Sequence, residues 1–248
     1  MANAKLEETI VYNELFARIL AHDLRNPLSA MMTAAQLLLL RQAGEGERQT
    51  KPLGRILASG ERMDRMIDQL LDFTSARSRG GLDIEPRETD LAELCARTIG
   101  ELEVAFPAWK ILRQVTGNTT GCWDPDRLAQ IVSNLVANAG QHGDAAGGIF
   151  LELDGTPADL VTLQIHNEGA IPEALLPALF DPFRSTRQRR VNSRGLGLGL
   201  FITQEIVNAH GGSVQVVSTE ALGTTFTIRL PRRSAPKPGV TAHSEVAS

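Results

Sequence analysis

His22 is the residue whose type and surroundings point most directly to chemistry, since it lies in the run HDLRNPLSA within a long helical pattern. On a helix it lies about 200° round from Leu20, so we expect its imidazole to point away from the apolar seam. A neutral imidazole is a competent nucleophile near pH 7. Asp23 follows directly and is suited to take up the ring proton, while Asn26 lies one turn further on the same face. Taken alone, His22 is also compatible with an ordinary surface histidine.

Two stretches, from Leu6 to about Leu40 and from Leu53 to Leu70, carry apolar residues at alternating spacings of three and four, which is a heptad pattern. The seam residues are Leu6, Ile10, Ala17, Leu20, Leu24, Met31, Ala35 and Leu38, then Leu53, Ile56, Gly60, Met63, Ile67 and Leu70. The run RQAGEGERQTKP between them predicts a turn joining antiparallel helices. One hairpin cannot bury its seam alone, so we expect two copies to pair into a four-helix bundle. A coiled-coil linker without chemistry is the alternative.

After Ala76–Gly81 the pattern changes to a mixture of short strands and helices. We expect strands at residues 82–86, 111–115, 149–153, 160–166, 213–218 and 224–230. We expect helices at residues 89–105, opened by Asp90, and at 125–140, 172–179 and 198–209. This mixture predicts an α/β fold, a two-layer sandwich that follows the helical hairpin. The expected domains are 1–80 and 81–231, followed by a disordered tail at 232–248 that has little apolar surface to bury.

Two further patterns suggest phosphate chemistry. Asn134 and Asn138 lie one helical turn apart, so both amides share a face and can hold Mg²⁺, together with the phosphate oxygens that it bridges, through hard oxygen ligands. In RGLGLGLF, Gly195, Gly197 and Gly199 precede a predicted helix, whose N-terminus attracts phosphate. The bland alternatives are a polar helix face and a glycine-rich turn.

The run HDLRNPL resembles the phosphoacceptor box of sensor histidine kinases of the HisKA type, H-[E/D]-x-R-[T/N]-P-L, and it meets every motif position. The resemblance implies that His22 is phosphorylated on a ring nitrogen and that Asp23 assists its deprotonation. It also implies that Asp23 and Asn26 support dephosphorylation of a response regulator, with Asn26 positioning a water.

DPDRLAQIVSNLVANAGQHG and RGLGLGLF resemble the N and G2 boxes of the same family, whose nucleotide-binding domain is an α/β sandwich of the GHKL type. The resemblance implies that Asn138 binds Mg²⁺ and that Asn134 and His142 lie near the phosphates of ATP. Gln141 stands where a lysine is common. Between the phenylalanine box FDPF and G2, the basic run RSTRQRRVNSR, which ends at Arg194, is expected to form a mobile lid over the triphosphate. LGTTF, with Thr224, resembles the last glycine box.

The G1 box departs from the family form D-x-G-x-G, because this chain reads IHNEGAIP. Aligning Asn167 and Gly169 with D-x-G retains the first glycine but leaves the loop one residue short, whereas aligning from His166 keeps the length and loses both glycines. We favour Asn167, whose amide oxygen can still accept from the adenine amino group. The lost charge should weaken adenine recognition by ~1–2 kcal/mol. The N-x-G form occurs among relatives of the bacteriophytochrome-linked kinases, which this sequence resembles in HDLRNPL and QHG.

The composition excludes several other classes of protein. A net charge of −4 argues against a nucleic-acid-binding face. Cys95 and Cys122 have no partners at metal spacing, so we expect two buried thiols and no disulfide framework. The sequence has no apolar run long enough to span a membrane and no basic leader, so a cytoplasmic location is expected. The chain begins almost at the predicted bundle, so the sensor domain is expected to be absent or on a separate protein.

The leading hypothesis is therefore a homodimeric, ATP- and Mg²⁺-dependent histidine kinase core that autophosphorylates His22 and passes the phosphoryl group to a response-regulator aspartate. A degenerate kinase that serves as a dimeric scaffold or as a regulator phosphatase is the second hypothesis, based on the altered G1 box and Gln141. A gyrase- or chaperone-like ATPase is the third, and the complete H box argues against it.

Overall fold

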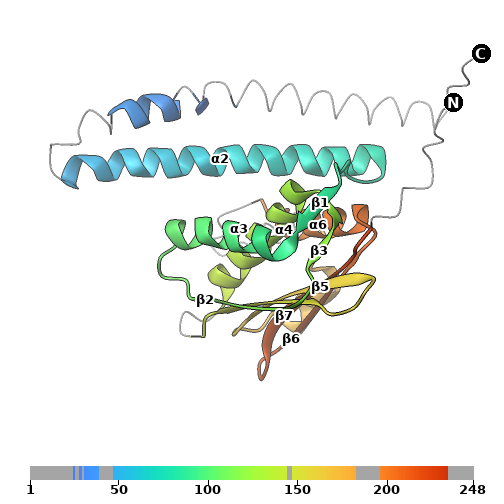
Figure 1. Ribbon diagram of the computed structural model, residues 1–248. Coiled ribbons are helices and arrows are strands. Elements are labelled where there is room, and N and C mark those ends of the chain that lie inside the picture. The colour runs from blue at the N-terminus through green and yellow to red at the C-terminus, as the bar shows by residue number, and fades with distance from the viewer. Residues whose placement is uncertain are drawn as a thin grey trace, which may run out of the picture. The chain divides into compact units, whose positions relative to one another are not determined.

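The computed structural model describes residues 25, 28–29, 31–38, 47–143, 147–182 and 196–233 (Figure 1). These residues form two compact units. The first takes the described residues of Met1–Leu82 and Leu179–Glu205, and the second those of Asp83–Ala178 and Ile206–Ser248. The sequence-based limits of 1–80 and 81–231 stay a prediction.

The first unit is dominated by α2, a helix of 33 residues from Glu47 to Arg79, which packs against the helical residues 28–29 and 31–38. Leu28 and Ile67 are buried against each other, with Met32 and Leu71 around them. A Cβ on Gly60 would lie 2.5 Å from Cγ of Met32, so the absence of a side chain permits this close approach. The seam residues Ala35, Gly60 and Ile67 are thus buried inside the hairpin.

The other half of the predicted α2 seam is exposed. Ile56, Met63 and Leu70 recur every seven residues, and 49%, 46% and 36% of their surfaces are accessible. The heptad positions of α2 therefore form two groups: Gly60 and Ile67 are buried within the hairpin, whereas Ile56, Met63 and Leu70 are exposed to solvent in the single chain.

The predicted turn at residues 41–52 extends too far, because α2 already begins at Glu47. The charged residues from Glu47 to Lys51 are good helix formers, which explains why the helix includes part of the predicted turn. At its other end α2 is followed by Gly80, with φ of +66°, and the backbone N–H of Gly81 donates to the carbonyl of Ala76.

The second unit is built on a five-stranded sheet in the order β2-β4-β5-β7-β6. The strands are β2 (Ile111–Gly117), β4 (Ile149–Gly155), β5 (Leu160–Asn167), β6 (Ser213–Thr219) and β7 (Gly223–Pro231). β2 and β4 pair in parallel and the other neighbours are antiparallel. All five were predicted from the sequence, with ends within two residues.

Helices α3 (Leu91–Ala105) and α4 (Pro125–His142) cover one face of this sheet (Figure 1). Each begins at an aspartate N-cap: Asp90 accepts from the N–H of Ala92, and Asp124 accepts from those of Asp126 and Arg127. On this face Leu151, Leu153, Leu163 and Ile165 are fully buried. The sequence thus forms the two layers that its alternating patterns predicted.

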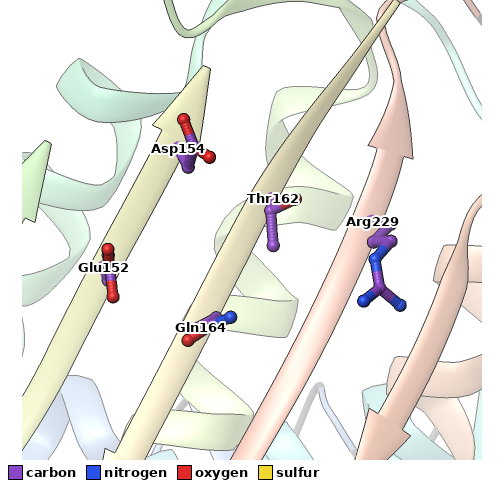
Figure 2. Close-up of a pocket in the computed structure, with 5 residues that line it drawn as sticks. All are labelled: Glu152, Asp154, Thr162, Gln164 and Arg229. Atoms are coloured by element: carbon purple, nitrogen blue, oxygen red, sulfur yellow. The ribbon is translucent and has the colours of Figure 1, made fainter. Parts of the chain in front are cut away.

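The opposite face of the sheet carries polar side chains and is open. It contains a shallow pocket of about 180 Å³, whose lining residues come from β4, β5 and β7 (Figure 2): Glu152, Asp154, Thr162, Gln164 and Arg229. These residues alternate along their strands with the buried ones, which explains why the pocket lies on the side away from α3 and α4.

Two sequence predictions were wrong in detail, and one strand was not predicted. Residues 82–86 are not a strand; the strand is β1 (Arg87–Asp90), paired with the unpredicted β3 (Thr120–Trp123). Residues 172–179 form only η1, a 3-10 helix over Glu173–Ala178, because Pro177 cannot supply the N–H that an α-helix needs.

The predicted tail begins too early, since Arg232 is well anchored. Its guanidinium donates to the carbonyls of Asn118, Thr120, Gly155 and Pro157. Composition alone did not reveal these contacts, and residues 234–248 lie outside the described part of the chain.

Both cysteines are free thiols, Cys95 buried and Cys122 half-buried. Burial raises the pKa of Cys95 to about 12, which keeps it protonated and unreactive. Within the described ranges, no helix has the length and apolarity needed to cross a membrane.

Candidate functional site

Helix α4 presents the two amides predicted from the sequence. Its apolar side is buried against the sheet through Leu128, Ile131, Val132, Leu135, Val136 and Ala139. Asn134 and Asn138 are half-buried at one edge of this face, and His142 is exposed in the last turn. Residues four apart lie on the same side of a helix, so the three polar side chains form one row along α4.

This row ends beside Asn167, the last residue of β5. The N–H of Gly143 caps α4 by donating to the carbonyl of Ala139. A Cβ on Gly143 would lie 3.1 Å from Nδ2 of Asn167, and a Cβ on Gly169 would lie 2.9 Å from the carbonyl oxygen of His142. The C-terminus of α4 and the predicted G1 segment are therefore in close contact, and glycines make that contact possible.

The orientation of the Asn167 amide is set by its neighbour. Only 4% of Asn167 is accessible, and its Nδ2 donates to the carbonyl of Glu168 at 3.2 Å. With the NH₂ group used in this way, Oδ1 is the atom left to accept a hydrogen bond from a ligand. Asn167 can thus act as an acceptor, as the aspartate of the usual G1 box does, but without its charge.

Thr224 lies opposite Asn167 on β7 and closes the same loop. Its hydroxyl donates to the carbonyl of Gly169 at 2.7 Å. The Ser218 hydroxyl, on β6, lies 2.7 Å from the Thr224 hydroxyl and accepts from the N–H of Ile171 at 2.8 Å. The sequence analysis did not identify Ser218; its only signal there was a position six residues before Thr224 on the adjacent predicted strand.

Gly223, just before Thr224, is required by geometry. Its φ is +69°, and a Cβ there would lie 2.4 Å from the carbonyl oxygen of Asn167. A side chain at this position would therefore displace Asn167 as well as strain the backbone.

A buried histidine supports the other end of α4. His210 is fully buried; its Nδ1 lies 2.8 Å from the carbonyl of Ile206, and its Nε2 accepts from the N–H of Asp124 at 3.0 Å. Nδ1 therefore carries the ring proton and the imidazole is neutral. Burial lowers the pKa of His210, which is consistent with this state. Asp124 also accepts from the N–H of Glu85, so one residue ties the start of α4 to the segment before β1.

Of the predicted phosphate-binding residues, those of the G2 box fall in the first unit or outside the described residues. Gly197 has φ of +71°, and Gly199 is the first residue of α6 (Gly199–Ala209). Five further residues with predicted roles lie outside the described part of the chain: His22, Asp23, Asn26, Arg194 and Gly195. The structure therefore brings together Asn167, Gly169, Thr224 and the end of α4, while the remaining assignments stay predictions.

Arg25, three residues after His22 in the sequence, is anchored to α2. Its Nε lies 2.8 Å from Oδ1 of Asp64, and its Nη2 lies 2.6 Å from Oδ1 of Asp68. The hydrogen bond to Asp64 and the charges of both aspartates raise the pKa of Arg25. Arg25, the arginine of the H-box motif, thus joins its own helix to α2.

Within the part of the chain that the structure describes, no cluster of three His, Cys, Asp or Glu side chains is suited to hold a metal ion. Amide oxygens such as that of Asn138 are hard ligands that suit Mg²⁺ only when phosphate oxygens or water complete its coordination. The donor set therefore fits a metal that arrives with a nucleotide.

Two family models match the chain in the order that this site implies. Residues 12–79 match the His Kinase A (phospho-acceptor) domain, and residues 123–234 match the histidine kinase-, DNA gyrase B- and HSP90-like ATPase. The chain belongs to the histidine kinases: it carries the phospho-acceptor and ATPase domains that together form their catalytic core.

Curated relatives agree with this assignment. The chain is 37% identical over 219 residues to the bacteriophytochrome of Pseudomonas aeruginosa, covering 88% of this chain and 29% of that protein. It is 33% identical over 219 residues to the sensor histidine kinase TrcS of Mycobacterium tuberculosis, covering 85% of this chain and 42% of TrcS. The chain thus spans less than half the length of these relatives.

Solved structures share the fold. Full-length ShkA, solved in complex with AMPPNP, has a TM-score of 0.67 at 23% identity, over 90% of this chain and 46% of ShkA. The catalytic domain of the histidine kinase ThkA has a TM-score of 0.52 at 25% identity, over 61% of this chain and 98% of that domain.

Proposed function

We propose that this chain is the core of a two-component sensor histidine kinase, which phosphorylates His22 from ATP and passes the phosphoryl group to an aspartate of a response regulator. The observation that carries the proposal is the site where the end of α4 meets Asn167, Gly169 and Thr224, in an ATPase domain that follows a phospho-acceptor domain containing His22.

In this proposal, Oδ1 of Asn167 accepts from the 6-amino group of adenine, and the row Asn134, Asn138 and His142 leads from the base to the phosphates. Asn138 would hold Mg²⁺ together with phosphate oxygens, and the ion would neutralise charge that develops on the phosphates. The glycine run from Gly195 to Gly199 and Arg194 would bind the triphosphate through backbone N–H groups and a guanidinium.

The proposed reaction is a phosphoryl transfer to nitrogen. A ring nitrogen of His22 attacks the γ-phosphorus, the N–P bond forms, and the bond from phosphorus to the bridging oxygen breaks to release ADP. The proton of the ring passes to Asp23. Transfer to the regulator then breaks the N–P bond and forms an acyl phosphate on the acceptor aspartate. In the reverse signalling direction, Asn26 would place the water that hydrolyses this acyl phosphate.

The proposed assembly is a homodimer through the helical hairpin. The exposed, heptad-spaced residues Ile56, Met63 and Leu70 support it, because their burial against a second copy would complete a four-helix bundle. Pairing of two hairpins would also create the surface to which a receiver domain docks.

Labelling with γ-³²P ATP and Mg²⁺ tests the proposal. We expect label on the wild-type protein that is lost in acid and kept in alkali, and that is absent from His22→Gln and strongly reduced in Asn138→Ala. Label that survives in His22→Gln would contradict the assignment of the acceptor. Nucleotide binding without any label would instead favour the dimeric scaffold or phosphatase, which the uncharged Asn167 makes the second candidate.

A further inference from the structure

A chain of hydrogen bonds joins β6 and β7 to the loop that follows β5, which contains the predicted G1 segment. It runs from the N–H of Ile171 to Ser218, from Ser218 to Thr224, and from Thr224 to the carbonyl of Gly169, with distances of 2.8, 2.7 and 2.7 Å. Its first member can only donate and its last can only accept. The direction of both hydroxyl protons between them is therefore determined.

This direction defines what Thr224 offers to a ligand. Its proton is committed to Gly169 and one of its lone pairs accepts from Ser218, so only a lone pair remains. Oδ1 of Asn167, across the β5–β7 pair, is likewise an acceptor. Oγ1 of Thr224 and Oδ1 of Asn167 are thus two acceptor atoms on paired positions of β5 and β7, an arrangement that suits a 6-amino group better than a 6-oxo group.

We propose that Ser218 is a positioning residue for adenine recognition, because it holds the segment from Gly169 to Ile171 and orients Thr224 so that the pocket selects 6-amino over 6-oxo purine nucleotides. This inference rests on the proposed function for the identity of the nucleotide site. Ser218 itself touches no base; it acts through Thr224 and through the backbone of Ile171.

Two observations distinguish this role from general support of the fold. Ser218 is half-buried near the end of β6, and its hydroxyl accepts from the N–H of Ile171 in the loop and donates to the hydroxyl of Thr224. The loop between Gly169 and Ile171 is anchored at two points, Gly169 by Thr224 and Ile171 by Ser218. Removal of the Ser218 hydroxyl would release one anchor and leave the sheet pairing of β6 with β7 intact.

The test measures binding of ADP and IDP, which differ at the 6-position, to the full chain by isothermal titration calorimetry. Wild type should bind ADP more tightly than IDP. Ser218→Ala should weaken ADP binding about fivefold to tenfold, as expected for one lost hydrogen bond, and should change IDP binding much less. Ser218→Thr keeps the hydroxyl and should restore the preference, while Ser213→Ala, an exposed serine on the same strand, should leave it unchanged.

The preference for ADP over IDP is the deciding quantity. An equal loss of affinity for both nucleotides in Ser218→Ala would assign Ser218 to general stability and overturn the inference, as would an unchanged preference. These binding results are independent of phosphorylation: a protein that binds ADP selectively but never labels His22 would refute the kinase proposal and leave the role of Ser218 standing.

Discussion

Arg232 offers a sharp test of how this fold is held together, because a single side chain links the ends of four strands. Its Nη1 donates to Thr120 at 2.6 Å, and its Nη2 donates to Asn118 at 2.6 Å, to Gly155 at 2.7 Å and to Pro157 at 3.0 Å. The acceptors are backbone carbonyls in the β2–β3 and β4–β5 connections. Arg232→Ala would leave all of them without this donor.

The expected cost follows from the geometry. A hydrogen bond from a charged donor contributes ~1.5–3 kcal/mol when it is buried. One N–H of Nη1 contacts Thr120, and the two N–H groups of Nη2 are shared among three carbonyls, so three charged donors are lost. Arg232 is only half-buried and the contact with Asn118 is exposed, so solvent screening lowers the contribution of each donor to ~1 kcal/mol. We therefore expect Arg232→Ala to lower the unfolding free energy of the ATPase domain by ~3 kcal/mol. Arg232→Lys should recover only part, since an ammonium cannot reach carbonyls on both sides as a planar guanidinium does.

Urea unfolding followed by tryptophan fluorescence measures this effect in the right domain. The protein has two tryptophans, Trp109 and Trp123, and both lie in the second unit. Trp123 is fully buried and its Nε1 donates to the carbonyl of Pro231, the residue before Arg232. Arg229→Ala is the matched control, because Arg229 is exposed and its guanidinium donates to the side chain of Gln215 rather than to backbone carbonyls of the strand connections. A midpoint for Arg232→Ala equal to that of the control would refute the reasoning.

Three other outcomes follow from the same contacts. Because burial holds the pKa of His210 below its ordinary value of 6.5, the unfolded state binds this proton first as the pH falls. The contribution of His210 to stability should therefore be constant above pH 6.5 and fall by up to about 1.4 kcal/mol per pH unit below it, and His210→Gln should flatten this slope in urea titrations. Gly223→Ala should weaken ADP binding at least about tenfold, because the new Cβ would displace Asn167. Gly211→Ala is the control for backbone strain alone, since its φ is a similar +71° and nothing lies within 4 Å of the new Cβ. Equal losses of ADP affinity in the two variants would exclude displacement of Asn167 as the cause. Met63→Glu should shift the chain from dimer to monomer in analytical ultracentrifugation, since the charge would enter the proposed seam, and a dimer of unchanged affinity would place the interface elsewhere.

Much of the fold was predictable because its signals are local. The alternation of apolar and polar residues identified β2, β4, β5, β6 and β7, and Asp90 marked the start of α3. β1 and β3 were missed or misplaced because each is four residues long and is stabilised by the other, some thirty residues away. Arg232 was assigned to the tail for the same reason: its partners are distant in sequence.

The candidate site likewise combines local signals with contacts between distant residues. Motif spacing predicted Asn167 and Thr224 as site residues, but not the hydrogen bonds that orient their side chains. Ser218 has no motif of its own, and its importance follows only from the register that places it opposite Thr224. Pairwise contacts across strands are the part of the site that a single sequence does not reveal.

The pairing of β5 with β7 has a consequence for how such a domain can diversify. The chain leaves β5 after Asn167 and enters β7 beside it, where Thr224 is the direct partner of Asn167 in the register; the edge strand β6 is added on the way. The segment between these two residues therefore begins and ends at neighbouring positions of the sheet. Additions or deletions within its connections can be absorbed without shifting the flanking strands, so new regulatory or ligand preferences can evolve there at little expense to the scaffold.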